Sequence, residues 1–377
     1  MKILLISAYF YPVTGGAENH MFYIARELVK KGHEVEVFVS DHDREKIIQK
    51  KEEIIDGIKI KRFKTLFRIS LSGMFFPGLF PAVKKTDADI IHIHGFRHPF
   101  TYASYFTNKP CLLTAHWPDY PKGLRPRYLD FLVSLYDKTL AKSCLKRFDK
   151  ICIVNELERN WLKKFNISNE KIVLTPNGIP SSYLKQANGL KFRKKYNIKK
   201  DELIVLCLSR LHKSKGLDLV AKLSHKFPNI KFVFVGIDGG FLQELKKLSA
   251  NNCIYTGKVD EEEKLQALNA ADIFIHPSHF EAFGIVVLEA FAQKTPVITS
   301  DSGGLPWVND MGLIFEDNNL QDLEEKLKLL INNKELREEI AKKGYEKAKN
   351  YTWEKIADKF EELYKNLKRK SKNENRI

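Results

Sequence analysis

Short runs of aliphatic and β-branched residues alternate with longer amphipathic stretches along the whole chain, and this alternation restricts the fold more than any other feature. The short runs are apolar on both faces, which is typical of parallel strands that helices cover on both sides. The alternation therefore predicts an α/β protein with parallel sheets. Strands are expected at residues 3–7, 34–39, 58–62, 90–94, 112–115, 151–154 and 172–174, and in a second series at 203–209, 231–235, 254–255, 272–276, 296–299 and 313–315.

A dense cluster of turn-forming residues, PNGIP at 176–180, separates the two series of strands. A chain of 377 residues suits two domains better than one. We expect one Rossmann-like domain at residues 1–178, a second at 179–350, and a crossover helix with a basic tail at 351–377 that returns to the first domain. Two such domains facing each other leave a cleft at the carboxyl ends of both sheets, where open parallel sheets bind ligands.

The net charge of +16 indicates an anionic partner, and the candidates are nucleic acid, an anionic membrane and a phosphorylated small molecule. Residues 59–85 hold seven basic residues and no acidic one, interleaved with Phe63, Phe67, Met74, Phe75, Phe76 and Phe80. They predict either a helical region whose aromatic residues belong to the core, or a surface that lies on an anionic bilayer. The sequence has no helix-turn-helix, zinc-finger or RNA-binding signature, so nucleic acid is not an expected partner.

The sequence contains no run of about 18 apolar residues, the length that a membrane-spanning helix needs. No cleavage site of small residues follows the apolar segment 2–12, so we interpret this segment as a buried strand and not as a signal peptide. The five cysteines are scattered and never form a Cys-x-x-Cys pair, which indicates buried free thiols in a reducing cytoplasm. We expect a cytoplasmic protein, in peripheral contact with the inner face of the cell membrane if residues 59–85 bind lipid.

The run HPSHFEAFGIVVLEA carries the strongest local signal. A predicted strand leads into it, Glu281 lies in the loop that follows, and Glu289 falls in the second turn of the next helix. The first amides of that helix, at Gly284, Ile285 and Val286, form a ready site for a phosphate. Two carboxylates that flank such a site can accept hydrogen bonds from hydroxyls on either side of a diphosphate. The alternative is a solvated Glu281 and a Glu289 that pairs with a neighbouring cation.

The run SRLHKSKG follows an apolar strand directly and brings Arg210 and Lys215 to the end of that strand. Arg210 offers a planar fork for phosphate and Lys215 a mobile point charge. Opposite the phosphate site described above, the two residues would form a diphosphate clamp. A solvated loop is the alternative.

Two weaker signals lie in the first domain. Paired glycines, Gly15 and Gly16, follow the first strand and let a ligand approach the backbone closely, although a plain strand–turn–helix connection explains them equally well. His116 lies at the end of a strand, where it can donate to a substrate oxygen or be a satisfied core residue. We interpret His92 as packing and His94 as an edge of the cleft.

Metal binding is not expected. Asp87-Ala88-Asp89 leads into a strand, and Asp41-His42-Asp43 lies in a charged loop, so neither resembles a well-placed Asp-x-Asp site. The predicted cation clamp also makes a metal ion unnecessary for binding a diphosphate.

Taken in order, these motifs resemble the retaining glycosyltransferases of family 4, or glycosyl transferases group 1, which have the GT-B fold. The resemblance covers nearly the whole chain and rests on Gly15-Gly16-x-Glu18, Pro176-Asn177-Gly178-Ile179, Ser209-Arg210-Leu211…Lys215-Gly216, Glu281-x7-Glu289 and Ser302-Gly303-Gly304-Leu305-Pro306. It implies that Arg210 and Lys215 hold the donor diphosphate. It also implies that Glu289 binds the ribose and that Glu281 binds hydroxyls of the transferred sugar. The segment 236–240 departs from the family's usual Gly-x-Gly, so the contact for the base stays open.

By the same resemblance, Gly15 and Gly16 line the sugar and acceptor side, and His116 lies at the reaction centre. The family retains the anomeric configuration by front-face attack, in which a departing phosphate oxygen takes the acceptor's proton. The resemblance implies no cofactor, and UDP- or GDP-sugars are the candidate donors. We expect a sugar or lipid-linked acceptor. The alternatives are a sugar-nucleotide epimerase of the same fold and a non-catalytic basic protein that binds membrane or nucleic acid.

Overall fold

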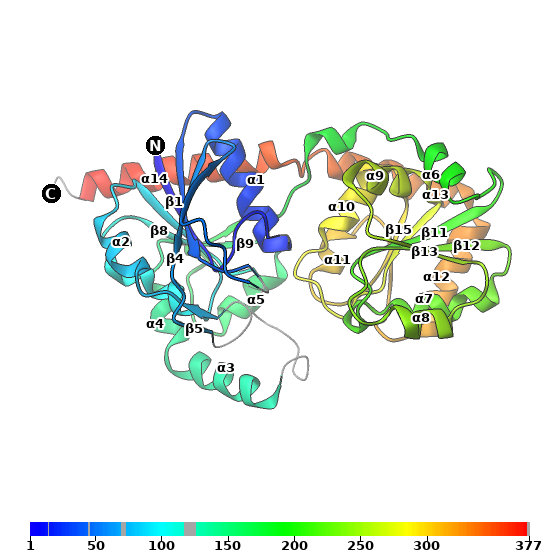
Figure 1. Ribbon diagram of the computed structural model, residues 1–377, viewed down its shortest axis with the longest axis horizontal. Coiled ribbons are helices and arrows are strands. Elements are labelled where there is room, and N and C mark those ends of the chain that lie inside the picture. Colours follow the sequence, from blue (N-terminus) through cyan, green and yellow to red (C-terminus); the bar gives the residue numbers. More distant parts are fainter. Residues whose placement is uncertain (14, 44–45, 69–72, 117–125, 375–377) are drawn as a thin grey trace. The chain divides into compact units, whose positions relative to one another are not determined.

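The computed structural model describes residues 1–13, 15–43, 46–68, 73–116 and 126–374. The chain divides into two compact units, each with its own parallel sheet (Figure 1). Unit 1 consists of Met1–Asn177 with Trp353–Ile377, and unit 2 of Gly178–Thr352. The prediction of two parallel α/β domains is confirmed.

The sheet of unit 1 has eight strands in the order β10-β9-β8-β7-β1-β2-β4-β3. All neighbours are parallel except β3, which runs antiparallel to β4. The central strands β7 and β8 are buried at every residue, which explains why they are mainly apolar; their polar residues are His92, His94 and Thr114. The strands are β1 (Lys2–Ile6), β2 (Glu34–Ser40), β3 (Glu52–Ile55), β4 (Ile58–Phe63), β7 (Ile90–His94), β8 (Cys111–Thr114), β9 (Lys150–Ile153) and β10 (Ile172–Leu174), and a separate antiparallel pair is formed by β5 (Phe67–Arg68) and β6 (Met74–Phe75).

The sheet of unit 2 has six parallel strands in the order β13-β12-β11-β14-β15-β16. Helices α6, α9, α10 and α13 contact one another on one side of it, and α7, α8 and α12 on the other (Figure 1). The strands are β11 (Leu203–Leu208), β12 (Ile230–Val235), β13 (Cys253–Gly257), β14 (Ile273–His276), β15 (Val297–Ser300) and β16 (Leu313–Phe315). All five cysteines of the chain are free; four are buried and Cys253 is half-buried.

Helices connect the strands of both units. Those of unit 1 are α1 (Gly16–Lys30), α2 (Leu79–Lys85), α3 (Arg127–Thr139), α4 (Ala141–Lys146), α5 (Leu157–Lys163) and α14 (Trp353–Glu374). Those of unit 2 are α6 (Gly189–Lys195), α7 (Leu217–Leu223), α8 (Leu242–Leu248), α9 (Glu261–Ala270), α10 (Ile285–Ala292), α11 (Leu305–Val308), α12 (Leu320–Asn332) and α13 (Lys334–Ala348). Short 3₁₀ turns are η1 (Pro99–Phe106), η2 (Asn169–Lys171), η3 (Ser181–Leu184), η4 (Lys213–Lys215) and η5 (Ser224–Lys226).

Each sheet has one point at which the strand order reverses. In unit 1 this point lies between β1 and β7, and in unit 2 between β11 and β14. Because the connections leave such neighbouring strands toward opposite faces, the loops after their carboxyl ends are free to receive a ligand. Gly15 and Gly16 follow β1, Arg210 and Lys215 follow β11, and Glu281 follows β14, whereas His116 follows the neighbouring strand β8.

Strand β3 was not predicted. Its sequence, EEII, alternates in exposure at the edge of the sheet and lacks the two-faced apolar character of the other strands. The tight connection to β4 is made by Asp56 and Gly57, both at positive φ (50° and 78°), as a two-residue hairpin turn requires. The Asp-Gly pair was the available signal for this hairpin.

The helical interpretation of residues 59–85 is wrong. The described residues of the segment form β4, where a strand was expected, the two paired strands β5 and β6, and one short helix, α2. Phe63, Met74 and Phe76 are core residues, with 8%, 0% and 2% of their surface exposed, whereas Phe67 is 53% exposed. The aromatic residues of this segment therefore divide between the core and the surface.

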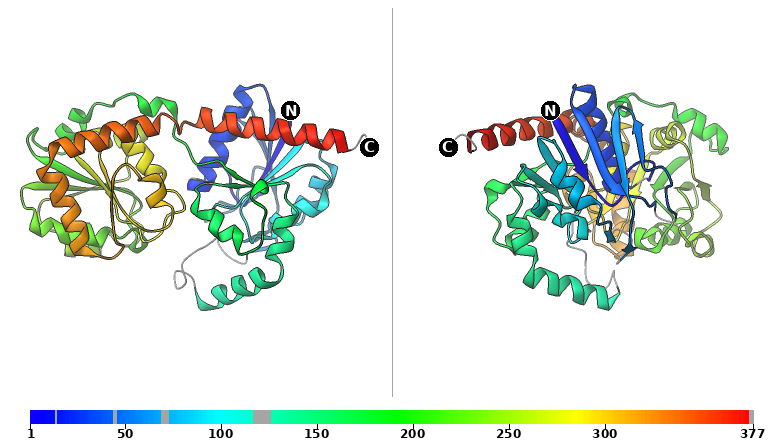
Figure 2. Two further views of the ribbon diagram at one scale, coloured as in Figure 1. Left: turned by 180° about the vertical axis from the view of Figure 1, so that it is seen from behind. Right: turned by 60° about the vertical axis from the view of Figure 1, so that its left-hand side comes forward.

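Helix α14 belongs to unit 1, along which it extends in both views of Figure 2. The predicted amphipathic helix at 353–367 is confirmed and continues to Glu374. Its apolar face, with Phe360 and Tyr364 fully buried, lies against α1 and β7. Lys368 adds an ion pair with Asp89 at 2.6 Å.

Helix α3 is unlike the other long helices because none of its residues is buried. It contacts α4 and lies at the margin of unit 1 (Figure 1). Among the helices of the described residues, none is both long and apolar enough to cross a bilayer.

Candidate functional site

The loops that follow β11 and β14 meet at the reversal point of unit 2. Lys215 ends the turn η4 after β11, and Glu281 lies between β14 and α10. The Lys215 ammonium forms an ion pair with Oε1 of Glu281, and Nε2 of His276 lies 3.1 Å from the same oxygen. Both known contacts of the carboxylate thus fall on Oε1. The Lys215 and Glu281 side chains remain about one-fifth exposed (20% and 22%), so a ligand can reach them.

Backbone hydrogen bonds fix these loops to each other. The amide of His279 donates to the carbonyl of Ser214 at 3.0 Å, which joins the Glu281 loop to the Lys215 loop. The amide of Gly304 donates to the carbonyl of Glu281 at 2.8 Å, which joins a third loop after β15. The distance between the Lys215 cation and the Glu281 carboxylate is therefore set by backbone contacts as well as by their charges.

Glu281 is ionised in the folded protein. Burial by itself raises the pKa of this carboxyl, but the charge of Lys215 and the hydrogen bond from His276 outweigh burial and lower the pKa to about 2. The usual pKa of a glutamate is 4.5. The site therefore presents a carboxylate, an acceptor of hydrogen bonds, at every physiological pH.

The lowered pKa of Glu281 predicts a stability contribution that depends on pH. This contribution is fully present above about pH 4.5 and is lost as the pH falls toward 2, because the unfolded state then binds the proton that the folded state excludes. The difference in unfolding free energy between the wild type and Glu281→Gln should therefore become about 2 kcal/mol less favourable to the wild type when the pH is lowered from 7 to 3. Urea unfolding of both proteins at the two pH values measures this; an advantage that does not change with pH would contradict the ion pair.

A second polar cluster surrounds Glu289 on α10. Lys264 of α9 lies 2.9 Å from the carboxylates of both Glu289 and Glu261, and it contacts the hydroxyl of Tyr183 at 3.2 Å. Burial alone lowers the pKa of Lys264, but the two carboxylates and Tyr183 outweigh it, so the pKa is raised. Glu289 is therefore held in place by a permanently charged lysine, as the alternative interpretation of its sequence position predicted.

Helix α10 begins at the reversal point with Gly284 as its N-cap residue, in the left-handed conformation (φ 84°). No side chain caps this end of the helix within the described part of the chain. The backbone amides and the positive end of the helix dipole therefore favour an anion at the start of α10, where Ile285 and Val286 form the first turn.

Arg210 does not join the Lys215–Glu281 pair. Its side chain is exposed, and its Cγ and Cδ atoms lie beside Gly239, where an added Cβ would be 2.9 and 3.2 Å from them. Within the loop 236–240, Asp238 accepts hydrogen bonds from the amides of Gly240 (2.8 Å) and Phe241 (3.1 Å) and so holds the turn that precedes α8. This loop therefore uses its carboxylate to hold its own backbone.

In unit 1, the candidate residues lie around the reversal point between β1 and β7. Gly15 precedes α1, and a Cβ added to Gly16 would meet no atom within 4 Å, so the backbone there is open. His116 follows β8 with φ 55°, and its Nε2 lies 3.3 Å from Nδ1 of His94. His94 is buried (2% exposed), so the prediction that it forms a cleft edge is wrong. The packing interpretation of His92, which is fully buried, is confirmed.

The two halves of the chain match two family models. Residues 14–183 match the model described as Glycosyltransferase Family 4, and residues 190–347 match the one described as Glycosyl transferases group 1. The chain belongs to glycosyltransferase family 4. It is a glycosyltransferase of group 1, as the resemblance of its motifs implied.

Relatives of this glycosyltransferase extend over nearly its whole length. The phosphatidylinositol N-acetylglucosaminyltransferase GPI3 subunit of Saccharomyces cerevisiae is 24% identical over 97% of the chain and 83% of the yeast protein. An uncharacterised glycosyltransferase of Methanocaldococcus jannaschii is 26% identical over 97% of the chain and 99% of its own length. Among solved structures, Anabaena HepE in complex with UDP and glucose has a TM-score of 0.75 at 19% identity, covering 97% of this chain and 100% of that one. These structural neighbours confirm the GT-B fold.

The structure of the glycosyltransferase brings some predicted site residues together and not others. Lys215 and Glu281 are in contact, while Glu289 lies in a separate cluster and Arg210 has an exposed side chain. No pattern in the sequence had pointed to His276, Lys264 or Tyr183 as part of the site. His276 was visible as the last residue of a predicted strand, but nothing in the sequence linked Lys264 or Tyr183 to Glu289.

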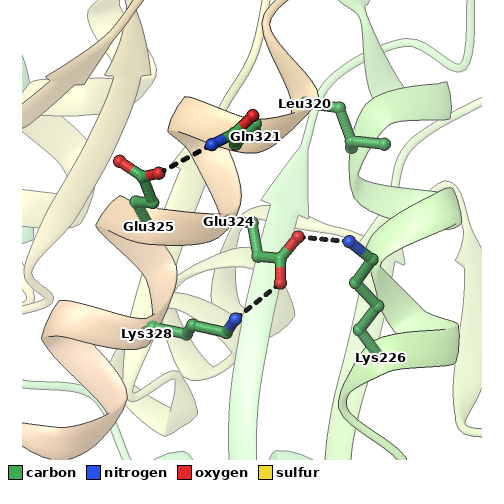
Figure 3. A pocket seen from close by; sticks show the side chains of 6 residues that line it. All are labelled: Lys226, Leu320, Gln321, Glu324, Glu325 and Lys328. Atoms are coloured by element: carbon green, nitrogen blue, oxygen red, sulfur yellow. Dashed lines mark hydrogen bonds and ion pairs between the residues drawn. The ribbon is translucent and has the colours of Figure 1, made fainter.

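Several charged residues of the glycosyltransferase outside this site form ion pairs with one another. In the described segments, no group of three or more His, Cys, Asp or Glu side chains could hold a metal ion. Asp87 pairs with Lys2. A shallow surface depression beside α12 is lined by Lys226, Leu320, Gln321, Glu324, Glu325 and Lys328 (Figure 3). There Glu324 pairs with Lys226 and, at 2.6 Å, with Lys328, so the depression offers no unpaired charge of Glu324 to a ligand.

Proposed function

We propose that the protein transfers a hexose from a UDP-sugar to a lipid-linked acceptor, with retention of the anomeric configuration. The observation that carries this proposal is the Lys215–Glu281–His276 cluster, which lies beside the uncapped start of α10 at the reversal point of the sheet. These groups suit a sugar diphosphate. The cation and the helix N-terminus can bind the phosphates, and the carboxylate can accept hydrogen bonds from sugar hydroxyls.

Each group receives one role in this proposal. The Lys215 ammonium and the exposed Arg210 guanidinium bind the diphosphate, together with the first amides of α10. Glu281 accepts hydrogen bonds from hydroxyls of the transferred sugar through Oε2, since its known contacts use Oε1. Glu289, held by Lys264, accepts hydrogen bonds from the ribose.

The residues of unit 1 serve the transferred sugar and the acceptor. The open backbone at Gly16, which Gly15 precedes at the start of α1, allows close approach of a substrate. His116 donates a hydrogen bond to a substrate oxygen.

The chemistry follows from charge. The bond between the anomeric carbon and the β-phosphate oxygen breaks, the acceptor oxygen bonds to the same face of that carbon, and its proton passes to the departing phosphate. Negative charge grows on the leaving diphosphate, where Lys215 and the α10 amides stabilise it. The proposal requires no cofactor and no metal ion, because fixed cations supply the positive charge.

Nucleotide binding tests the donor site. UDP is the first candidate because the HepE structure that shares this fold contains UDP. We expect UDP to raise the melting temperature by several degrees without added metal and in the presence of EDTA, with smaller shifts for GDP and ADP. Glu289→Ala should abolish the UDP shift, because the ribose loses its acceptor.

Glu261→Gln is the matched control for this test. It removes the other carboxylate that contacts Lys264 but leaves Glu289 in place, so the UDP shift should persist. Failure of all three nucleotides to shift the wild type would overturn the proposed function. Equal losses in the two variants would show that Glu289 acts through the stability of the cluster.

A lipid-linked acceptor is supported by two observations. By their names, the relatives from yeast and from Arabidopsis thaliana act on phosphatidylinositol. In addition, α3 carries a stripe of exposed apolar side chains at positions i, i+3, i+4 and i+7. They are Tyr128 (65% exposed), Phe131 (68%), Leu132 (48%) and Leu135 (49%). Contiguous exposed apolar side chains of this kind typically mark a site that binds a membrane or another protein.

Charge selects an anionic bilayer as the partner of this stripe. Arg127 precedes Phe131 by one helical turn and Lys138 follows Leu135 by another, so cations flank the apolar side chains. The helix also carries Asp130 in its first turn and Asp137 near its end, and Asp137 is bound by Arg97 at 2.8 Å. From the segment 59–85, Phe67 adds an exposed aromatic residue. We propose that these side chains contact the inner face of the cell membrane.

Vesicle binding tests the membrane contact. The wild type should sediment with vesicles that contain phosphatidylglycerol, and Phe131→Ser with Leu135→Ser should weaken this binding on the order of tenfold, because two apolar side chains no longer enter the bilayer. Leu190→Ser is the matched control, since Leu190 is 62% exposed but lies in unit 2. A wild type that ignores anionic vesicles at physiological salt would exclude the membrane contact.

A further inference from the structure

Four histidines of unit 1 meet at the carboxyl end of β7. His20 comes from α1, His92 and His94 from β7, and His116 follows β8. Their ring centroids are separated by 4.1 Å (92 and 94), 5.1 Å (20 and 116), 5.5 Å (94 and 116) and 5.6 Å (20 and 94). Aromatic residues of α14 cover the cluster, with Phe360 5.8 Å from His20 and 5.3 Å from His92.

The ring nitrogens of the cluster have unequal partners. Both nitrogens of His92 are bonded, Nδ1 to the hydroxyl of Tyr364 (2.6 Å) and Nε2 to that of Thr114 (2.7 Å). Nδ1 of His20 lies 2.6 Å from Oδ1 of Asn177. By contrast, Nε2 of His20 and Nε2 of His94 are enclosed and have no hydrogen-bond partner in the part of the chain that the structure describes.

All four rings are neutral at physiological pH. Burial lowers the pKa of His20 to about 4 and those of His92, His94 and His116 well below the usual 6.5. Each neutral ring carries a single proton, and the other nitrogen is an acceptor. The positions of these protons therefore decide which rings donate.

The unpartnered nitrogens determine the positions of the protons. An N–H that is buried without an acceptor is rarer and costlier than a buried acceptor that lacks a donor. The proton of His94 is therefore on Nδ1, which leaves Nε2 as the bare nitrogen. Nδ1 of His94 then donates to Nε2 of His116 across 3.3 Å. By the same reasoning, Nδ1 of His20 donates to Asn177.

We propose that His94 is a positioning residue that fixes His116 in the tautomer with its proton on Nδ1. Because Nε2 of His116 is occupied as an acceptor, the remaining nitrogen presents an N–H and not a lone pair. His116 is therefore built to donate a hydrogen bond to substrate and cannot act as a base through Nδ1. Its left-handed backbone (φ 55°) shows that its position is imposed by its surroundings. The inference deepens the proposed function, in which His116 contacts substrate.

The tautomer can be measured without substrate. Long-range proton–nitrogen correlation NMR of protein labelled with ¹⁵N-histidine distinguishes Nδ1–H from Nε2–H rings, and the His116→Gln spectrum assigns the signal. We expect His116 as Nδ1–H in the wild type. A signal with the proton on Nε2 would overturn the inference, whatever the enzyme's activity.

Variants of His94 test its effect on His116. The side-chain nitrogen of an asparagine occupies the place of Nδ1 and can donate, so His94→Asn should keep the His116 tautomer and transfer within about threefold of the wild-type rate. A leucine is apolar and cannot donate, so His94→Leu should give a mixture of His116 tautomers and lower kcat on the order of tenfold with little change in KM.

His92→Leu is the matched control, since it changes a buried histidine of the same strand without touching His116. It should lower stability but keep the His116 signal. Equal kcat losses in His94→Asn and His94→Leu with an unchanged His116 signal would overturn the positioning role. If the wild type does not bind UDP, the proposed donor site is refuted, but the result on the His116 tautomer still stands.

Discussion

Lys215→Met should lower kcat/KM for the nucleotide-sugar donor on the order of 10²- to 10³-fold, the largest effect of a single side chain that we expect in this protein. The ammonium of Lys215 balances the Glu281 carboxylate and, in the proposed function, the charge that grows on the leaving diphosphate. Methionine preserves the length and most of the volume of the side chain but not its charge. Glu281 would keep the hydrogen bond from His276 but lose its cation, so its pKa should rise.

Lys226→Met is the matched control for this prediction. Lys226 is a lysine of the same unit, paired with Glu324 beside the depression in Figure 3. Removing the Lys226 ammonium should leave kcat/KM within a factor of about two of the wild-type value, since exposed ion pairs contribute little to stability. Transfer is measured with the donor that the nucleotide-binding experiment identifies. A loss of less than tenfold for Lys215→Met would remove Lys215 from the diphosphate site.

Gly216→Ala should lower the free energy of unfolding by about 3 kcal/mol and transfer activity on the order of 10²-fold. Gly216 has φ 61°, where an added Cβ costs about 1 kcal/mol by itself. That Cβ would also lie 2.0 Å from the carbonyl oxygen of Pro277, a backbone atom that cannot rotate away. The Lys215 loop must therefore separate from the Glu281 loop, and the ion pair between them loses its geometry.

Gly257→Ala separates the two causes of this loss. Gly257 has a similar φ of 72°, but a Cβ there meets no atom within 4 Å. We expect it to cost about 1 kcal/mol and to leave activity unchanged. Urea unfolding and transfer assays of both variants measure the difference. Equal costs for the two would show that the contact between the loops does not fix the site.

Several parts of the candidate site could be predicted from sequence because they follow strands. Strands buried on both faces are continuous apolar runs, and their carboxyl ends mark the places where ligands bind in parallel sheets. Lys215 and Glu281 were found in this way. Strand β3 was missed because an edge strand has no such run. Strands β5 and β6 were missed because two residues each are too few to show an alternating pattern.

Local periodicity and spacing along the chain are sufficient to predict the α/β class, most strand positions, the amphipathic helix α14 and the identity of the residues at the strand ends. Which of those residues touch follows only from the packing of the folded chain. It joined Lys215 to Glu281 across 66 positions, Lys264 to Glu289 across 25, and His94 to His116 across 22. It also left α3 with no buried residue. These partners are set by strand order, which depends on how whole elements pack and cannot be inferred from a local sequence pattern.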